Sequence, residues 1–249
     1  MSTTALGDTF DIHGGGADLT FPHHENEIAQ SEGATGHHFV NYWMHNGFVR
    51  VNDEKMSKSL GNFFTIREIL RHFRAEEIRY FILTSQYRSQ LNYDEEHLLN
   101  ARSALNRFYT ALRGLPEAEP AGAGRWVDAF NAAMNDDFNT PEALAAMFEL
   151  AREINRLRSG DESTAAGLAA ELRRLGGLLG ILQHDPEAWL RGEAAADGIP
   201  DEEVEKLVQQ RLDAKAARNW GEADRIRDQL KELGILLEDG ASGTSWRRS

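Results

Sequence analysis

The amino-acid sequence predicts a mixed α/β segment, followed by an all-α helical bundle and a small mixed α/β domain at the C-terminal end. Short β-branched and aromatic runs beside glycine-rich turns occupy residues 1–62, whereas apolar residues at helical spacing dominate residues 94–184. Residues 201–249 combine two amphipathic helical stretches with a terminal strand. We expect a connecting helical region at residues 63–93 and a linker at residues 185–200.

Composition and charge narrow the class of protein. Of the 249 residues, 41% are apolar and 27% are charged, which is typical of a folded, soluble protein. No run of about 18 apolar residues and no apolar leader occur, so we expect neither a membrane span nor a signal peptide. The lack of cysteine excludes disulfides and favours the cytoplasm. The net charge of −13 argues against a nucleic-acid partner, although one locally basic face would be enough to bind it.

Six of the nine histidines fall within the first 45 residues, which makes this stretch the richest in chemical groups. Residues 10–13 predict a short strand that runs into Gly14-Gly15-Gly16, where the backbone can turn or approach a ligand closely. For three glycines alone, an ordinary tight turn is the simpler interpretation.

Pro22 favours the start of a helix, which we expect to span residues 22–31. On that helix His23 and Glu27 share one face, one turn apart. An imidazole and a carboxylate so placed can ligate zinc at about 2.0–2.2 Å. A solvated surface pair is the commoner meaning of this spacing, so both interpretations stay open.

Residues 38–49 predict a buried strand, a turn at Asn46-Gly47 and a second short strand. His45 falls near the end of the first strand, where α/β sheets place ligand groups, although a hydrogen-bonded core histidine is the simpler interpretation. The segment Lys55-Met56-Ser57-Lys58-Ser59 can close over a polyphosphate, because lysines supply mobile charge and serines supply hydroxyls. The alternative is a generic exposed polar loop.

The rest of the chain predicts helices and one strand. Thr65 and Glu68 form a capping-box pattern, and residues 115–124 read as a linker. Near the end, Trp246 and Arg247 could stack on and grip RNA, with a frayed basic tail as the simpler alternative. The expected helices span residues 75–85, 94–113, 141–158, 163–182, 201–217 and 221–233, and the expected strand spans residues 235–239.

Several of these motifs carry a family resemblance. Residues 10–19, residues 21–30 and the Lys-Met-Ser-Lys-Ser loop resemble the second half of the catalytic domain of class I aminoacyl-tRNA synthetases, specifically of bacterial cysteinyl-tRNA synthetases. Residues 135–141 and 243–248 also resemble that family, so the resemblance spans essentially the whole chain. It implies a partial Rossmann-type catalytic half-domain at the start, then a tRNA-binding bundle and a small anticodon-binding domain.

The resemblance also implies roles for single residues. His23 and Glu27 match two of four ligands of a Zn²⁺ ion that selects cysteine through its thiolate. Lys58, together with Lys55, matches the residues that stabilise the phosphates of ATP, which enters with Mg²⁺, during adenylate formation. Positions lining the amino-acid pocket are matched by His13, Asp18 and His45.

The implied function is that of a cysteine–tRNA ligase with tRNA-Cys, cysteine and ATP as partners, in a cytoplasmic monomer. In the family the other two zinc ligands are upstream cysteines, and this chain has none. The His-Ile-Gly-His-type ATP motif is also absent. We therefore expect a truncated form with weak zinc binding that is inactive alone. A non-catalytic tRNA-binding remnant is the alternative, and a cysteine:amino-sugar ligase is disfavoured by the segment after Pro200.

Overall fold

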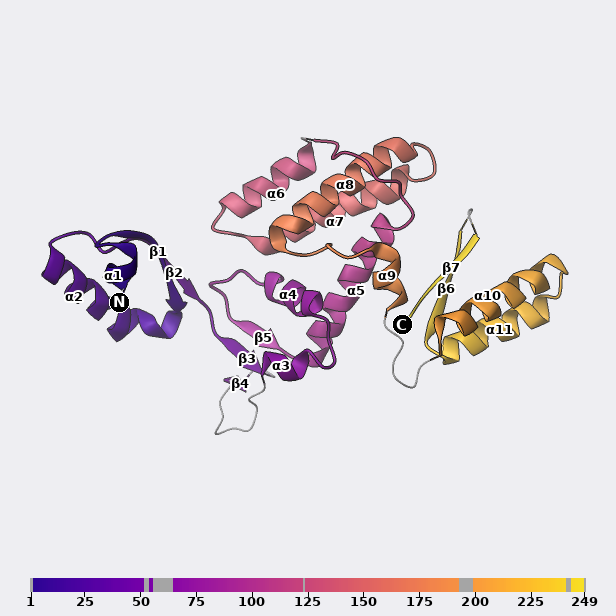
Figure 1. The fold of residues 1–249 in the computed structure, drawn as a ribbon, viewed down its shortest axis with the longest axis horizontal. Helices are drawn as coiled ribbons and strands as arrows, with labels where there is room; N and C mark the ends of the chain where they lie inside the picture. Colours follow the sequence, from indigo (N-terminus) through magenta and orange to yellow (C-terminus); the bar gives the residue numbers. More distant parts are fainter. Residues whose placement is uncertain are drawn as a thin grey trace. The chain divides into compact units, whose positions relative to one another are not determined.

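The computed structural model describes residues 2–51, 54–55, 65–122, 124–192, 199–240 and 243–248. The chain divides into two compact units, of which the first comprises Met1–Leu105 with Pro116–Ile181 and the second comprises Asn106–Leu115 with Leu182–Ser249. Both contain helices and small sheets (Figure 1), which confirms the predicted fold class. Among the described residues, no helix is long and apolar enough to cross a membrane.

The first unit begins with a parallel strand pair. Strand β1 (Phe10–Gly16) pairs with β2 (Val40–Asn46), with Phe10 opposite Val40 and Gly16 opposite Asn46. A parallel pair needs a crossover between its strands. Here helix α2 (Glu25–Thr35) supplies it, and Gly36, with φ of 72°, ends that helix in the left-handed conformation. Helix α1 (Ser2–Leu6) precedes the pair, and the short turns η1 (Ala17–Leu19) and η2 (Thr20–His24) precede α2.

One local prediction in this region is wrong, and another is only partly right. The three glycines continue strand β1 instead of forming a tight turn. Helix α2 proper begins at Glu25, but within η2 only Phe21 has non-helical dihedral angles, φ −133° and ψ 132°, so the helical path starts at Pro22 as predicted. It ends at Thr35, beyond the expected end at residue 31.

A second, three-stranded sheet has the order β4-β3-β5. Its central strand β3 (Val49–Val51) runs antiparallel to β4 (Glu54–Lys55) and parallel to β5 (Leu91–Tyr93). Gly47 precedes β3 and passes so close to the chain that a Cβ there would lie 2.0 Å from the carbonyl oxygen of Ser89. Strand β3 confirms the predicted second short strand.

Helices dominate the remainder of the first unit. The predicted capping box is confirmed at the start of α3, where the Glu68 amide donates to Thr65 Oγ1 at 3.3 Å and the Thr65 amide donates to Glu68 Oε2 at 2.6 Å. Helix α5 continues into the second unit. The helices that follow β4 are α3 (Ile66–Ile69), α4 (Ala75–Leu83), α5 (Glu95–Leu112), α6 (Arg125–Asn135), α7 (Thr140–Leu157) and α8 (Glu162–Leu179).

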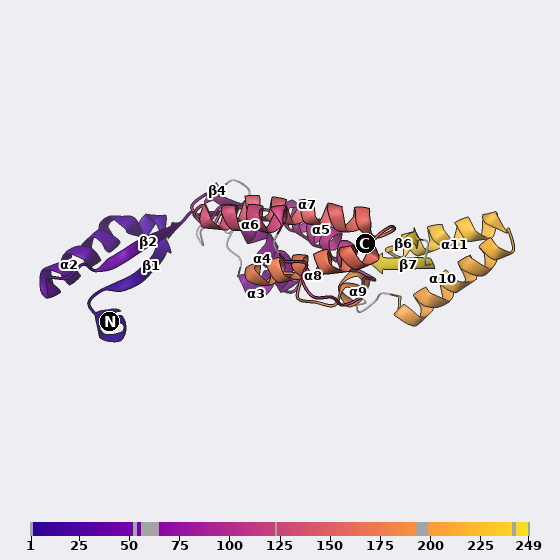
Figure 2. The same ribbon diagram turned by 90° about the horizontal axis from the view of Figure 1, so that it is seen from above.

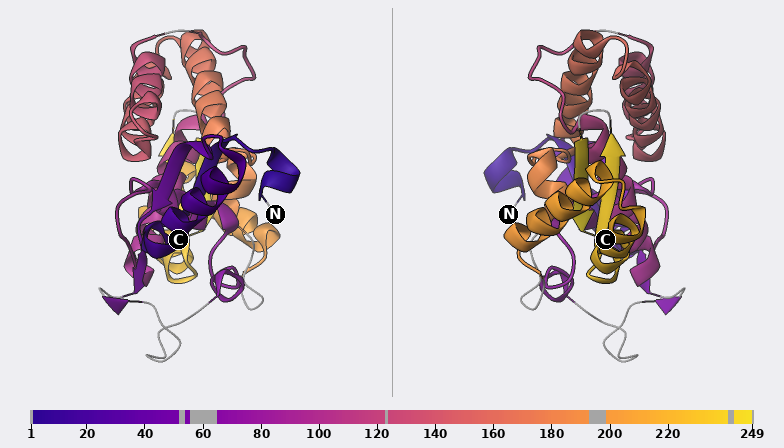
Figure 3. Two further views of the ribbon diagram at one scale, coloured as in Figure 1. Left: turned by 90° about the vertical axis from the view of Figure 1, so that its left-hand side faces the viewer. Right: turned by 90° about the vertical axis from the view of Figure 1, so that its right-hand side faces the viewer.

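Helices α6, α7 and α8 lie side by side (Figure 3). The core between them is apolar and includes Met147, Leu150, Ile154, Leu172 and Leu175, each with 0% exposure. Sequence patterning missed α6, although Val127, Phe130 and Ala133 follow a helical repeat and are buried. Asn139 caps α7 by accepting from the Glu142 amide.

The second unit contains helix α9 (Pro186–Arg191), inside the segment expected to be a linker. Asp185 caps it, and Trp189 is buried against Tyr109 with ring centroids 4.5 Å apart. The Trp189 indole also donates to Asn106 Oδ1 at 2.9 Å. These contacts anchor residues that a pattern of Pro, Gly and charge alone assigns to a loop.

The C-terminal part of this unit is a helix pair with a hairpin. Helices α10 (Asp201–Ala216) and α11 (Trp220–Glu232) lie side by side, and the antiparallel strands β6 (Ile235–Gly240) and β7 (Gly243–Arg248) accompany them (Figure 2). The frayed-tail alternative is wrong, because the last described residues form β7. The shared core consists of Val204, Val208, Ile226, Leu230, Ile235 and Trp246.

Candidate functional site

Strands β1 and β2 gather aromatic and imidazole side chains at their carboxyl ends. His13 is the register partner of Trp43, and Gly15 is the partner of His45. The Trp43 ring stacks on both imidazoles, at 4.5 Å from His13 with a 22° interplanar angle and at 5.9 Å from His45 with a 3° angle. The indole thus fixes the orientation of two histidines on neighbouring strands.

The His24 ring packs against the same side chains, with its centroid 4.9 Å from that of His13 and 5.0 Å from that of Trp43. The residue is only 4% exposed. Its Nδ1 is 2.9 Å from His45 Nε2, so one ring donates a hydrogen bond to the other. Gly15 makes room for the imidazole, since a Cβ at that position would lie 2.7 Å from His24 Cε1 and 3.0 Å from Nε2. The glycine-rich strand therefore allows a histidine to approach the backbone closely.

His13 and Glu27 face one another across the same cluster. His13 Nε2 lies 3.3 Å from Glu27 Oε2, with the two side chains 17% and 46% exposed. Both His13 Nδ1 and Glu27 Oε2 are buried atoms without a hydrogen-bond partner among the described residues. Ligand atoms of His13, His24 and Glu27 all lie within 4.8 Å of one another. Two imidazoles and a carboxylate form a donor set that suits a divalent transition metal.

The structure gathers only some of the predicted site residues. Glu27 belongs to the convergent group, but His23 is exposed and is not part of it. Asp18 lies in η1, directly after β1, and is exposed. Lys55 ends strand β4, and Lys58 lies outside the described residues. The roles assigned to these residues stay predictions.

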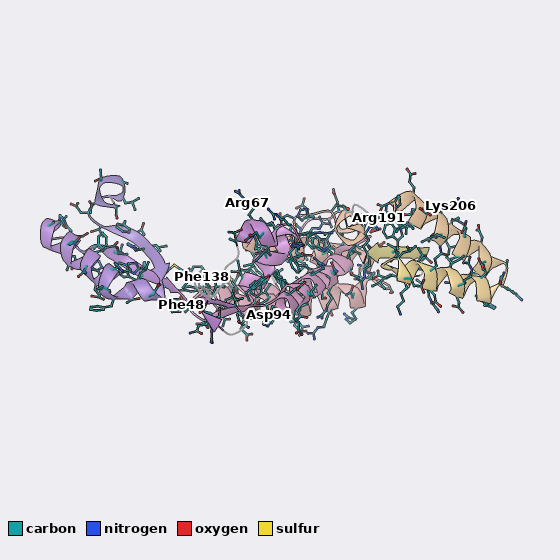
Figure 4. All side chains as sticks on the ribbon, turned by 90° about the horizontal axis from the view of Figure 1, so that it is seen from below. Phe48, Arg67, Asp94, Phe138, Arg191 and Lys206 are labelled. Carbon is teal, nitrogen blue, oxygen red and sulfur yellow. The ribbon has the colours of Figure 1, made fainter. Side chains whose placement is uncertain are left out.

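In the second unit, Trp246 is a core residue. It is 3% exposed, and its indole donates to Glu205 Oε1 at 3.1 Å. The guanidinium carbons of Arg191, labelled in Figure 4, and Arg248 each lie 5.4 Å from the ring centroid. Arg247 Nε donates to Glu238 Oε1 at 3.0 Å. The Trp246 ring, which the sequence analysis considered for stacking on RNA, is therefore covered by other residues of the protein.

The sequence analysis did not consider a second tryptophan of this domain, Trp220, which is exposed. Trp220 begins helix α11 and is 60% exposed, beside Arg218 with its positive φ of 59°. Together with Leu233, which is 45% exposed, Trp220 is one of two large apolar side chains that are exposed among the described residues of this domain. Its position, next to an Asn cap at a helix start, gave no hint of exposure in the sequence.

The sequence analysis also did not predict the polar network around Asp137. Asp137 accepts from Arg88 Nε at 2.6 Å and from the Tyr87 hydroxyl at 2.8 Å. These donors, Arg88 first, hold the pKa of the Asp137 carboxyl below its usual value. Asp137 and Phe138 have φ of 51° and 55°, and the 50%-exposed Phe138 is labelled in Figure 4. The hydrogen bonds thus hold two residues in a disfavoured backbone conformation.

Three family models match the chain in succession. They are the class I (C) catalytic domain of tRNA synthetases at residues 1–103, the DALR domain at residues 129–183 and the cysteinyl-tRNA ligase anticodon binding domain at residues 197–247. The chain belongs to the cysteinyl-tRNA synthetase family. The resemblance predicted from the motifs is thereby confirmed.

Curated relatives agree with this assignment. The cysteine–tRNA ligase of Azotobacter vinelandii is 63% identical over 99% of this chain and 53% of its own length. The Methylococcus capsulatus enzyme is 60% identical over 100% of this chain and 54% of its own length. The chain thus spans about half the length of these cysteinyl-tRNA synthetases.

A solved structure of LeuRS from Agrobacterium radiobacter, in a ternary complex with tRNA and LeuAMS, shares the fold. The TM-score is 0.54 at 20% identity, over 72% of this chain and 27% of that chain. This likeness concerns the fold alone, and it agrees with a class I synthetase architecture.

Proposed function

We propose that this chain supplies the tRNA-binding and amino-acid-pocket parts of a cysteine–tRNA ligase. One observation carries the proposal: a catalytic-domain match, a DALR match and an anticodon-binding match follow one another in the order expected for such a ligase. In this function the cysteine carboxylate attacks the α-phosphorus of ATP and displaces pyrophosphate. The terminal ribose hydroxyl of tRNA-Cys then attacks the carbonyl of the cysteinyl adenylate and displaces AMP. The non-catalytic tRNA-binding protein is the second candidate.

The histidine cluster would orient the amino acid. Trp43 holds His13 and His45 in fixed orientations, and Glu27 adds a buried carboxylate oxygen. A zinc ion, when bound, supplies a Lewis acid that prefers a thiolate to a hydroxyl and so selects cysteine over serine. The buried oxygen of Glu27 fits a cation, whereas exposed His23 does not join the group that converges on it. Lys55 and Lys58 would stabilise charge that develops on the ATP phosphates.

The C-terminal domain would contact RNA through Trp220 and not through Trp246. Base stacking needs an accessible ring face, and Trp220 is 60% exposed whereas Trp246 is 3% exposed. Arg218 immediately precedes this helix start and adds a positive charge that suits the phosphate backbone. The proposal thus moves the stacking role within the same domain.

Binding of tRNA-Cys tests the proposal. Replacing Trp220 by Ala should weaken binding by the full chain, with a loss of about 1–3 kcal/mol for one lost base stack. Leu233→Ala is the control, because it removes an exposed apolar side chain of the same domain that has no ring to stack on a base, and it should leave affinity unchanged. A filter-binding titration at fixed salt measures both. Equal affinity of the Trp220 variant and the parent chain would remove that residue from the RNA contact.

Cysteine-dependent exchange between ATP and pyrophosphate tests whether this chain alone can activate cysteine. We expect no exchange by this chain alone, because the His-Ile-Gly-His-type motif is absent from its sequence. Measurable exchange that depends on cysteine would show that the residues present are sufficient for activation. Absence of exchange by the isolated chain agrees with both candidates, and exchange restored by a second polypeptide that carries the His-Ile-Gly-His-type motif would favour the ligase.

A further inference from the structure

We propose that Asp137 is a positioning residue for the proposed amino-acid pocket: it anchors residues 86–89, and these residues in turn fix the backbone where strand β2 ends. The proposal rests on the proposed function, because β2 carries His45 of that pocket. Asp137 lies in the turn between helices α6 and α7, and all the residues concerned belong to the first compact unit.

Three consecutive residues donate hydrogen bonds to Asp137. Gln86 Nε2 donates to its main-chain oxygen at 3.1 Å, the Tyr87 hydroxyl donates to Oδ1 at 2.8 Å, and Arg88 Nε donates to Oδ2 at 2.6 Å. Arg88 Nη2 also donates to Oδ1 at 3.2 Å, so the guanidinium is bidentate. Both charged groups are about half exposed, and a lone ion pair so exposed contributes little. One residue that holds three neighbouring side chains is instead an anchor for the whole loop.

The turn that carries Asp137 has a backbone conformation that other contacts must stabilise. Asp137 and Phe138 have φ of 51° and 55°, in the left-handed region that residues other than glycine rarely adopt. Residues in such sparsely populated conformations persist where their surroundings determine them, and they gather at functional positions. Here the surroundings include the loop at residues 86–89, so the turn and the loop hold each other in place.

The same loop packs directly against Gly47, two residues after His45. The Gly47 amide donates to the Tyr87 carbonyl oxygen at 2.8 Å. A Cβ on Gly47 would lie 2.0 Å from the Ser89 carbonyl oxygen and 2.8 Å from that of Arg88. The two backbones therefore touch with no side chain between them. Because close-packed groups transmit strain, a displacement of the loop would displace Gly47 as well.

These contacts form a continuous path from the turn between α6 and α7 to the end of β2. Phe48 and Phe138, which directly follow the two ends of this path, are labelled in Figure 4. Strand β2 ends at Asn46, and His45 immediately precedes it. A displacement at this end of the strand would change the position of His45 relative to strand β1. Asp137 would thereby affect the pocket without touching the amino acid, so its role is positioning and not catalytic.

Hydrogen exchange of the Gly47 amide in the full chain, followed by NMR, tests the anchoring step. Asp137→Gly removes the carboxylate and relieves the backbone, so the turn itself should survive, and Asp137→Asn removes only the charge. We expect Gly47 exchange to become about tenfold faster or more in Asp137→Gly, and faster by a smaller factor in Asp137→Asn. Amides of helix α8 are the internal reference, because global destabilisation would accelerate both alike. Asp136→Asn, the same change on the exposed neighbouring residue, is the matched control and should leave the ratio unchanged.

The imidazole resonances of His45 and His38 test whether the anchoring reaches the pocket. His45 lies at the anchored end of β2, whereas His38 precedes the strand at its other end. Asp137→Gly should shift the His45 resonances and leave those of His38 unchanged. Faster Gly47 exchange with unshifted His45 resonances would overturn the positioning role, and so would Gly47 exchange that keeps its ratio to the α8 amides. Neither measurement uses tRNA, ATP or cysteine, so a negative result here is distinct from failure of the proposed function.

Discussion

At the residue scale, Gly15 determines where a buried histidine can lie. The imidazole of His24 occupies the space that a Cβ at position 15 would take, at 2.7 Å from its Cε1. The glycine is needed for this close approach and not for a turn, because β1 continues through it. The structural role of the glycine run can therefore be recognised only once the side chain that packs against it is known.

Replacing Gly15 by Ala should displace His24 and break its hydrogen bond with His45. The imidazole resonances of both histidines should shift in NMR spectra. Gly33→Ala in helix α2 is the control, since a Cβ there meets nothing within 4 Å. Unchanged histidine resonances in the Gly15 variant would contradict the described packing.

Asp137 makes a pH-dependent contribution to stability at the same scale. Its pKa is lowered in the folded state, chiefly by Arg88 and then by Tyr87. A lowered folded-state pKa gives stability that is present above the unfolded-state pKa of about 3.9 and lost as pH falls through the folded-state value. The difference in urea midpoint between the parent chain and Asp137→Asn should therefore be largest near pH 7 and shrink below about pH 4. A constant difference would contradict this account.

At the element scale, the β6–β7 hairpin shares one apolar core with helices α10 and α11 of the C-terminal domain. Trp246 on β7 packs with apolar residues of both helices, and Arg113 Nη1 donates to Glu238 Oε2 on β6 at 3.0 Å. Arg211 on α10 donates to both oxygens of Asp239 at 2.9 Å. The strand that follows the Gly/Ser turn is therefore fixed by tertiary contacts.

Truncating Trp246 should destabilise this domain. Trp246→Ala is expected to lower the free energy of unfolding by about 3–5 kcal/mol, as loss of a buried aromatic ring usually does. Trp220→Ala removes an exposed ring and should change it by less than about 0.5 kcal/mol. Urea denaturation of both variants measures the difference. Equal stability of the two variants would show that Trp246 is not part of the core.

Local signals predicted most elements, and contacts between elements account for the misses. The capping box at Thr65 was predictable because its two partners are three residues apart. Strand β7 and helix α9 were missed because distant residues, such as Tyr109 against Trp189, stabilise them. In the candidate site, His13, His45 and Glu27 were found by motif. His24 and Trp43 were missed, because the helix start and the strand register decide what they face.

At the scale of the whole molecule, the two proposed sites belong to different compact units of the chain. The histidine cluster lies in the first unit, and the anticodon-binding match lies in the second. Each unit has a buried core of its own, so the proposed amino-acid pocket and the proposed RNA contact of the C-terminal domain can be tested by separate variants in the full chain.

The affinity of this chain for tRNA-Cys, compared with the same tRNA carrying an altered anticodon, tests the central claim most directly. The account predicts that the altered anticodon weakens binding at fixed salt, and that Trp220→Ala reduces this discrimination. Equal affinity of the parent chain for both RNAs would contradict the proposal that its C-terminal domain recognises the anticodon of tRNA-Cys.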